Sequence, residues 1–143
     1  MAVTIDLYDH TARLFADGTA NSGATFQVVL CTAATFDATN TTLAGVTYTE
    51  VADGNGYTTG GQTLASVIVD TVNTNGASFD ADDLVWTASG GEITASYGIL
   101  HLVDGLDDPP LAFIDFGGSE SAVDGTDFII AWNASGIFTW TVA

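Results

Sequence analysis

Hydrophobic and polar residues alternate along much of this chain with a period of two, which is the pattern of half-buried β-strands. The stretch 137–142 is a clear example, because Phe138, Trp140 and Val142 share one side and two threonines lie opposite. The same period groups Ala112, Ile114 and Phe116 in 111–116, and Phe128, Ile130 and Trp132 in 127–132. One face of each strand is therefore expected to pack on a core while the other faces water.

Six other stretches also have the composition of strands, and they are separated by turn residues. These stretches are 3–8, 25–32, 46–51, 62–70, 84–87 and 95–103. The turns are rich in glycine and asparagine, which adopt the positive φ that tight turns require, and they lie at 53–56, 73–76, 89–91, 107–110, 124–125 and 133–136. The stretch 95–103 differs from the rest because it is apolar on both faces. It is predicted to be a central strand, or one whose second face is covered by a neighbouring subunit.

About nine short strands without intervening helices predict an all-β fold, either an antiparallel β-sandwich of jelly-roll-like layout or a barrel. One or two short helices are expected near the N-terminus. Asp9 is a candidate cap for a helix over 10–17 that ends at Gly18, and Asp37 is one for a turn or two within 36–44. The 143 residues are expected to form a single β domain, with 1–18 as an N-terminal arm plus the short helix.

The composition supports a packed domain and restricts its partners. Hydrophobic residues make up 47% of the chain, which is too many for a disordered protein, and no apolar run is long enough to span a bilayer. Eighteen acidic residues face a single base, Arg13, so the formal net charge is −17. That charge repels phosphate backbones and anionic lipids, so neither nucleic acid nor a membrane is expected as a partner.

Adaptation to salty surroundings is an alternative reason for the charge. The N-terminal residues do not resemble a secretory signal, which predicts folding in a cytoplasm.

The residues that usually carry catalysis are few and scattered. Cys31 lies in a strand-like stretch and is predicted to be a small buried hydrophobe, and a single cysteine excludes an intrachain disulfide. His101 alternates with apolar neighbours, which favours a packed or interface position, whereas His10 is expected at the surface. The glycine-rich stretch 54–61 has neither the spacing nor the lysine of a nucleotide-binding loop. No enzymatic activity and no cofactor are therefore expected, and a small hydrolase is the least supported alternative.

Two acidic clusters and the tryptophans leave other functions open. The clusters 80–83 and 104–108 could supply paired carboxylates or oxygen ligands for calcium, but their positions in turns favour ordinary solvated acids. The tryptophans Trp86, Trp132 and Trp140 are predicted to be mostly core residues, because each alternates with other apolar residues. An exposed tryptophan on a sandwich could stack on a sugar, so a carbohydrate-binding module is a further alternative.

Five segments, taken in order, resemble those of small bacteriophage virion proteins. They are GYTTGGQTL at 56–64, LVWTA at 84–88, ITASYGIL at 93–100, FIDFGG at 113–118 and GTDFIIAW at 125–132. The resemblance in order and spacing extends from about residue 36 to the end of the sequence. Proteins of this kind are usually described as structural, head-decoration or fibre-like components of the particle.

The resemblance implies a non-enzymatic protein that is made in the host cytoplasm and ends on the capsid surface of the virion. Capsid decoration (cement) proteins are often trimers, and they hold neighbouring capsid subunits together against the pressure of packaged DNA. The leading hypothesis is therefore a homo-oligomer, with a trimer expected, that binds the major capsid protein. A tail or fibre-associated virion component is the near alternative.

Two surfaces are expected to carry these contacts. The two-sided apolar strand and its neighbour are expected to supply the oligomer interface, through Tyr97, Ile99, His101, Val103, Leu111 and Phe113. The N-terminal segment carries the only base and precedes the β-core, so it is the candidate for contact with the capsid, through Val3, Ile5, Leu7 and Arg13.

Overall fold

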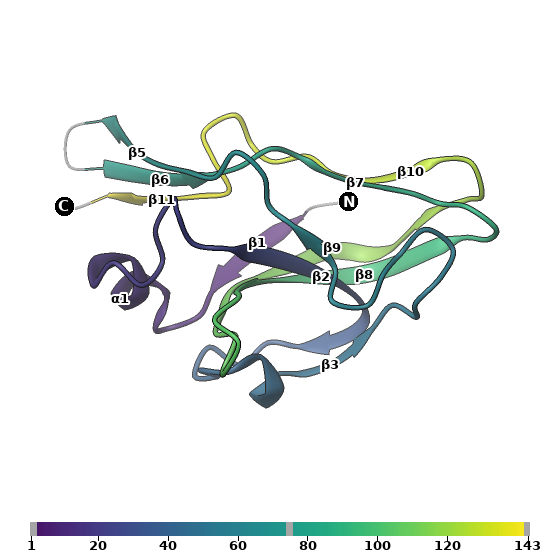
Figure 1. Cartoon of the computed structure of the whole chain (residues 1–143), viewed down its shortest axis with the longest axis horizontal. Coiled ribbons are helices and arrows are strands. Elements are labelled where there is room, and N and C mark those ends of the chain that lie inside the picture. Colours follow the sequence, from purple (N-terminus) through teal and green to yellow (C-terminus); the bar gives the residue numbers. More distant parts are fainter. Residues whose placement is uncertain (1–2, 74–75, 142–143) are drawn as a thin grey trace.

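The chain folds as an all-β sandwich, as predicted, and Figure 1 shows its computed structural model, which describes residues 3–73 and 76–141. Every pairing between neighbouring strands is antiparallel. The strands are β1 (Thr4–Leu7), β2 (Phe26–Thr35), β3 (Thr47–Glu50), β4 (Gln62–Thr63), β5 (Ile68–Asn73), β6 (Gly76–Asp80), β7 (Leu84–Thr87), β8 (Ile93–Leu102), β9 (Pro110–Ala122), β10 (Asp127–Ile130) and β11 (Phe138–Thr141). Two short helical elements accompany them, α1 (Thr11–Ala16) and the 3₁₀ turn η1 (Leu43–Gly45).

Six strands form one large sheet in the order β1-β9-β8-β2-β3, with β4 pairing to β2 along the same edge as β3. Two smaller sheets, β7–β10 and β5–β6–β11, lie opposite it and form the upper layer in Figure 1. The chain passes directly from β6 to β7 and from β10 to β11, so the smaller sheets lie end to end in that layer.

The main core fills the space between the two layers and is rich in aromatic rings. The ring of Phe79 in β6 is fully buried, and its centroid lies 5.0 Å from that of Phe26 in β2 and 5.1 Å from that of Phe138 in β11. Phe15 of α1 adds a further ring, 5.3 Å from Phe79. Burying each such side chain stabilises the fold by about 1.5–3 kcal/mol, so this cluster ties the two layers and α1 together.

The large sheet is also buried on its second face, over β2, β8 and β9. Val29, Ile99 and Phe113 form a second cluster there, and the residues that pack against it include Phe36 and Leu43. The chain's own segment 36–46 therefore covers this face. The stretch predicted to be apolar on both faces is the central strand β8, between β2 and β9.

The N-terminal segment that was predicted to be an arm is part of the fold. Its strand β1 pairs with β9 at the edge of the large sheet, and α1 is fixed by a hydrogen bond from Thr11 Oγ1 to the carbonyl of Leu111 (2.7 Å). The helix forms where it was predicted, and Gly18 adopts a φ of +81° just after it. The predicted cap is wrong, because His10 occupies the N-cap position and makes no capping hydrogen bond.

Three other local predictions differ from the structure. The stretch 62–70 is not one strand: the chain turns at Ser66 (φ +54°), so that β4 joins the large sheet and β5 joins the opposite layer. Strand β6 was not predicted. The turn within 36–44 is the 3₁₀ element η1, which is capped by Thr42, while Asp37 accepts hydrogen bonds from Thr39 instead. Residues 74–75 of the predicted turn at 73–76 and Val142 lie outside the described residues.

Candidate interaction groove

An open groove runs along one side of the sandwich, between the β1–β9 side of the large sheet and strand β10. It consists of two adjoining hollows of about 480 and 300 Å³ that share Val3, Ile130 and Ala131. The larger hollow is lined by Val3, Phe116, Glu120, Ser121, Asp127, Phe128, Ile129, Ile130 and Ala131. The groove therefore lies where the two layers diverge and where the described strands do not close the sandwich.

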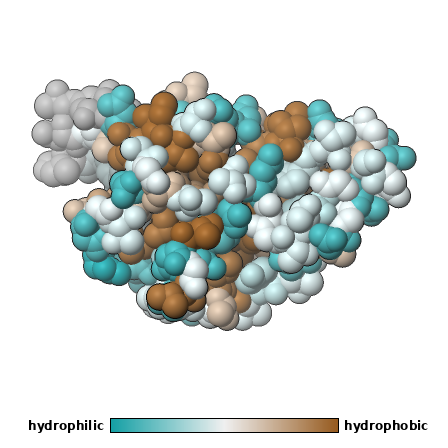
Figure 2. All heavy atoms as spheres, viewed as in Figure 1, coloured by the Kyte–Doolittle hydropathy of each residue, from teal (hydrophilic) through white to brown (hydrophobic). Residues whose placement is uncertain are grey.

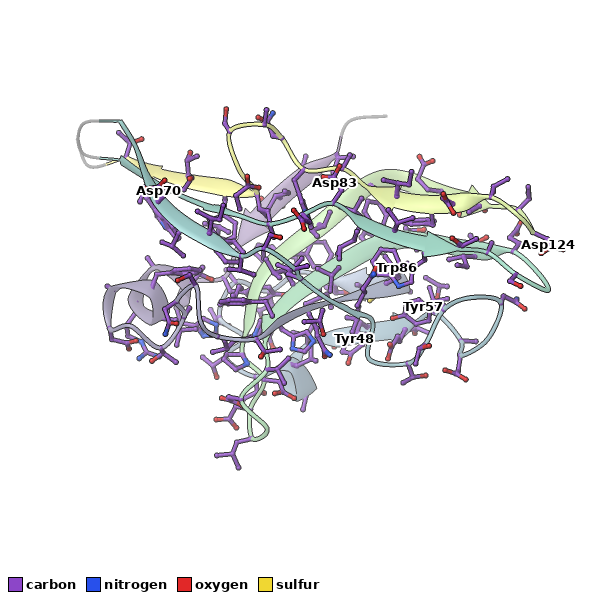
Figure 3. The ribbon with its side chains drawn as sticks, turned by 45° about the horizontal axis from the view of Figure 1, so that its top comes forward. Tyr48, Tyr57, Asp70, Asp83, Trp86 and Asp124 are labelled. Carbon is purple, nitrogen blue, oxygen red and sulfur yellow. The ribbon has the colours of Figure 1, made fainter. Side chains whose placement is uncertain are left out.

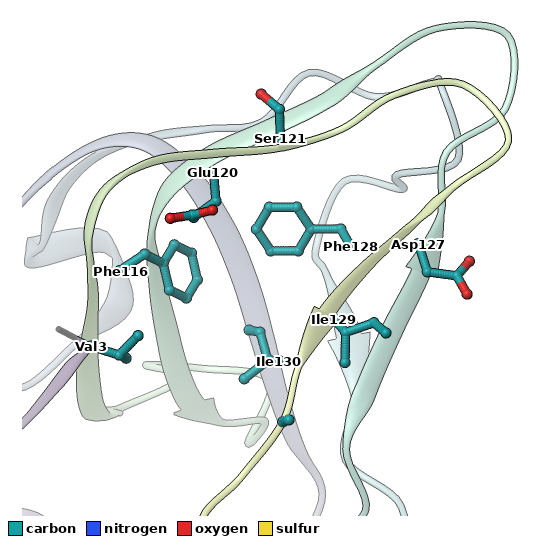
Figure 4. A pocket seen from close by; sticks show the side chains of 9 residues that line it. Val3, Phe116, Glu120, Ser121, Asp127, Phe128, Ile129 and Ile130 are labelled. Carbon is teal, nitrogen blue, oxygen red and sulfur yellow. The ribbon is translucent and has the colours of Figure 1, made fainter. Parts of the chain in front are cut away.

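The floor of the groove is apolar and its rim is acidic. Figure 4 shows Phe116 and Phe128 next to each other on this floor, with their ring centroids 5.8 Å apart in an edge-to-face contact, and both side chains are buried in the main core. Ile130 points into the groove beside them, while Asp127 and Ile129 point away from it, as the alternation of β10 requires. No basic residue lies near the groove, because the only Lys or Arg of the chain is Arg13, which forms an ion pair with Asp17 on α1.

Strand β10 has a free edge. In the described part of the chain it pairs with β7 alone. Just before β10, the N–H of Ala88 donates to the carbonyl of Thr126 (2.8 Å), so Ala88 and Thr126 form a hydrogen-bonded pair of the antiparallel ladder. Because hydrogen-bonded and non-hydrogen-bonded pairs alternate, Phe128 and Ile130 also bond toward β7. The backbone N–H and C=O groups of Asp127 and Ile129 therefore point to the free edge.

The opposite side of the groove is irregular. Strand β1 pairs with β9 over Thr4–Leu7, opposite residues 112–115, and no strand among the described residues pairs with β9 beyond there on that side. Gly117 and Gly118 have φ values of +79° and +157°, and the pairing register with β8 shifts there. This bulge bends β9 and leaves room beside Phe116, since a bulge locally disrupts the ladder and turns the strand.

A second notable site is a polar group of side chains beneath the second face of the large sheet. The hydroxyl of Tyr8 and Nε2 of His101 are buried, and neither has a hydrogen-bond partner among the residues that the structure describes. Burial lowers the pKa of His101 below its ordinary value and raises the pKa of the Cys31 thiol to about 12. A neutral imidazole and a protonated thiol are the forms that such an apolar environment favours. Cys31 and His101 therefore lie in a packed interior.

A hydrogen-bonded chain closes a gap along β2, between the places where β3 and β4 pair with it. The backbone N–H of Leu30 donates to the hydroxyl of Tyr57 (3.1 Å), which donates to Oε1 of Glu50 (2.7 Å). The same carboxylate oxygen accepts the N–H of Gly60 (2.6 Å). Figure 3 shows Tyr57 beneath Trp86, with their ring centroids 6.3 Å apart. The loop that carries Tyr57 is thus fixed to the large sheet.

The residues predicted for an oligomer interface are mostly covered by this chain. Ile99, His101 and Phe113 are buried on the second face of the large sheet, and Leu111 is fully buried in the main core. Tyr97 and Val103 are half-buried. An interface with another subunit at this place could use only these last two side chains, because burial within the chain already removes the others.

The residues predicted to contact a capsid are split between different environments. Val3 is 58% exposed and lines the groove. Ile5 and Leu7 are half-buried against the main core, with Ile5 also lining the smaller hollow. Arg13 lies on α1, outside the residues that line the groove. Of the residues predicted as capsid contacts, Val3 and Ile5 thus line this groove, whereas Phe116, Glu120 and the residues of β10 were not predicted as a site.

The acidic turn 104–108 is held by hydrogen bonds to its own backbone, whereas Asp82 and Asp83 of the other cluster accept hydrogen bonds from Ser66 and Trp132. Oδ1 of Asp104 accepts three N–H groups, from residues 106–108, and Oδ1 of Asp108 accepts those of Asp104 and Gly105. These bonds hold Leu106 at the tip of the turn with 91% of its surface exposed. Among the residues that the structure describes, no group of three or more histidine, cysteine, aspartate or glutamate side chains could hold a metal ion.

The tryptophans and the remaining histidine have structural contacts. Trp86 is buried, as predicted, and Trp132 and Trp140 are half-buried against the main core. The indole N–H of Trp132 donates to the carbonyl of Asp82 (3.1 Å). His10, expected at the surface, is half-buried, and its Nε2 lies 2.6 Å from the carbonyl oxygen of Pro110.

Hydrophobic residues on the face shown in Figure 2 form separate patches among polar ones. Across β7 and β10, Val85 and Ile129 are cross-strand partners that are 42% and 55% exposed. The Ile129 side chain points away from the groove floor, so these two residues form an apolar patch on the outer face of that layer. No helix in the described part of the chain is long and apolar enough to cross a membrane.

Comparison with known proteins yields no relative from which a function could be transferred. No family model matches the chain, and neither the curated proteins nor the solved structures contain a significant match. The resemblance to phage virion proteins therefore stays a prediction that is based on the order of the sequence motifs.

Proposed function

We propose that this protein is a non-enzymatic structural component of a bacteriophage particle, and specifically a capsid decoration protein that bridges neighbouring capsid subunits. The observation that supports this best is the contrast between a large sheet buried on both faces and an open groove with a free strand edge. A protein that bridges capsid subunits needs a rigid core and a surface that can bind another protein, and the buried sheet and the open groove would supply these two features.

The chemistry of the side chains favours binding over catalysis. The Cys31 thiol is buried and holds its proton, and the ring of His101 is enclosed by the chain. Nucleophilic catalysis needs a base within hydrogen-bond reach of an accessible hydroxyl or thiol, and neither of these residues offers one. The formal net charge of −17 keeps separate copies apart in solution and leaves a basic or apolar partner surface as the natural complement.

Mass spectrometry of purified particles, with heads separated from tails, tests the proposal. A decoration protein is expected in the head fraction, in a fixed ratio to the major capsid protein. Recovery in the tail fraction would instead support the alternative of a tail or fibre-associated component. Absence from both fractions would contradict a virion role.

Self-association is tested separately by sedimentation equilibrium of the purified chain. A trimer is expected at micromolar concentration, with three times the 14.7 kDa mass of the chain. A monomer under the same conditions, at both low and moderate salt, would refute the expected trimer. Salt matters because screening reduces the repulsion between copies that carry the same charge.

A further inference from the structure

We propose that the groove beside β10 is a docking site for an extended, basic segment of another protein, which pairs with the free edge of β10 as an added strand. The inference does not depend on the virion role, because it is based on the backbone, the apolar floor and the charge of this side of the molecule. It names the kind of partner that the groove accepts.

The free edge supplies the hydrogen bonds for such a strand. The N–H and C=O groups of Asp127 and Ile129 point away from β7, and they are the donors and acceptors that an incoming backbone would meet. Natural edge strands are often protected by lysine, proline or a bulge. Strand β10 contains no lysine or proline, and its exposed outward side chains are Asp127 and Ile129. At about 3.3 Å per residue, its four residues accommodate a segment of about four to five residues.

The apolar floor supplies the side-chain contacts. A strand added to β10 would direct every second side chain to the same face as Phe128 and Ile130, where Phe116 completes the floor. Its other side chains would lie on the outer face beside Asp127 and Ile129. The segment that fits is therefore one in which apolar residues alternate with residues that complement a carboxylate.

The charge identifies the partner as basic and as different from this chain. Asp127 lies on the outer side of β10 and Glu120 on the opposite wall, and no basic side chain of this molecule pairs with them at the groove. A second copy would bring another Glu120 and another Asp127 to the same place, along with a net charge of −17. A segment with lysine or arginine at alternate positions places these side chains beside Asp127 on the outer face, and its net positive charge is also attracted to Glu120 across the groove, without that repulsion.

The test is a titration of the ¹⁵N-labelled protein with an eight-residue peptide of alternating valine and lysine, followed by NMR. Saturable binding is expected, with the largest shifts at residues 116–131 and with slowed amide exchange at Asp127 and Ile129. A peptide of alternating glycine and lysine has the same charge but little tendency to form a strand, and it is expected to bind at least fivefold more weakly. A peptide of alternating valine and glutamate is expected not to bind.

Two pairs of variants separate the backbone from the charge. Ile129→Pro removes the N–H at the free edge without removing a bond to β7, and it is expected to weaken binding about threefold to tenfold, whereas Ile129→Thr keeps the N–H and should change binding less. Glu120→Gln with Asp127→Asn is expected to weaken binding about threefold at low salt. The matched control, Asp17→Asn with Asp37→Asn, removes the same charge away from the groove and should change binding less.

Several outcomes would overturn the proposal. Equal affinity for the two lysine peptides would show general attraction to an acidic surface, and shifts confined to other parts of the molecule would place the binding elsewhere. No saturable binding of the valine–lysine peptide would also contradict it. Self-association that Ile129→Pro abolishes would show that a second copy occupies the groove. Should Ile129→Pro unfold, the shifts and amide exchange of the unaltered protein decide the matter.

Discussion

Replacing Tyr57 with phenylalanine removes one oxygen atom from the hydrogen-bonded chain that closes the gap along β2. In the native protein this oxygen accepts the N–H of Leu30 and donates to Glu50. Tyr57 is 2% exposed, so water cannot easily replace the lost hydroxyl. After the substitution the Leu30 N–H stays buried without an acceptor, and Glu50 keeps only the N–H of Gly60 among these bonds.

The expected cost follows from the groups that are left behind. A typical neutral hydrogen bond contributes about 0.5–1.5 kcal/mol, and a buried group that loses its partner costs about 1–3 kcal/mol. The aromatic ring and its contact with Trp86 remain, so no large cavity forms. We therefore expect Tyr57→Phe to lower the free energy of unfolding by about 2 kcal/mol. Urea unfolding followed by tryptophan fluorescence measures it, as a lower midpoint with an unchanged slope.

Tyr8 provides the matched control for this prediction. Its ring is also buried, but its hydroxyl has no hydrogen-bond partner in the described part of the chain, and burial raises the pKa of this hydroxyl well above its ordinary value. Tyr8→Phe removes an oxygen whose burial is uncompensated, so the free energy of unfolding is expected to stay the same or to rise by up to about 1 kcal/mol. Equal losses in Tyr57→Phe and Tyr8→Phe would refute the reasoning, because the hydrogen bonds would then not distinguish the two sites.

Three further predictions concern single residues. A methyl group on Gly61 (φ +79°) would overlap the Val28 carbonyl, so Gly61→Ala is expected to lower the free energy of unfolding by more than about 3 kcal/mol. Gly18 has a similar φ of +81° but open space around it, so Gly18→Ala should lower the free energy of unfolding by only about 1 kcal/mol. Burial lowers the pKa of His101 in the folded protein, so the unfolded chain binds the imidazole proton more tightly. The free energy of unfolding should therefore stay constant above pH 6.5 and decrease below it. Urea unfolding at several pH values measures this decrease, which His101→Gln should lack. Cys31, whose pKa burial raises to about 12, should react with a thiol reagent much faster in denaturing urea than in the native protein, and equal rates would contradict its burial.

The fold could be predicted from the sequence where a strand's own residues alternate. Strand β7 has the predicted bounds, because Leu84 and Trp86 face inward while Val85 and Thr87 face outward. Strand β6 was missed because it contains one large apolar residue, Phe79, and it is a strand through its pairing with β5 and β11. The turn at Ser66 within 62–70 was missed because a residue other than glycine adopts a positive φ there, which the sequence does not signal.

The groove could not be predicted because openness depends on which strands fail to meet. Alternation indicated correctly that Phe116, Phe128 and Ile130 lie on inward faces. All three are buried in the main core and also line the groove, and only the arrangement of β1, β9 and β10 shows that this side of the core is open. The residues predicted for an oligomer interface show the opposite case. Their apolar face of β8 was expected to be open to another subunit, but residues 36–46 of the same chain cover it.

Because the chain contains a single lysine or arginine, digestion by trypsin can measure local unfolding at one defined place. Trypsin cleaves only after lysine or arginine, so Arg13 is the one site at which it can cut this sequence. That site lies in α1, which Thr11 and His10 fasten to the start of β9 through the carbonyls of Leu111 and Pro110. Cleavage of a folded chain requires this corner to unwind, and its rate follows the population of the open form when reclosing is fast. One protease and one band on a gel thus measure how firmly the N-terminal corner is held, without interference from any second cut.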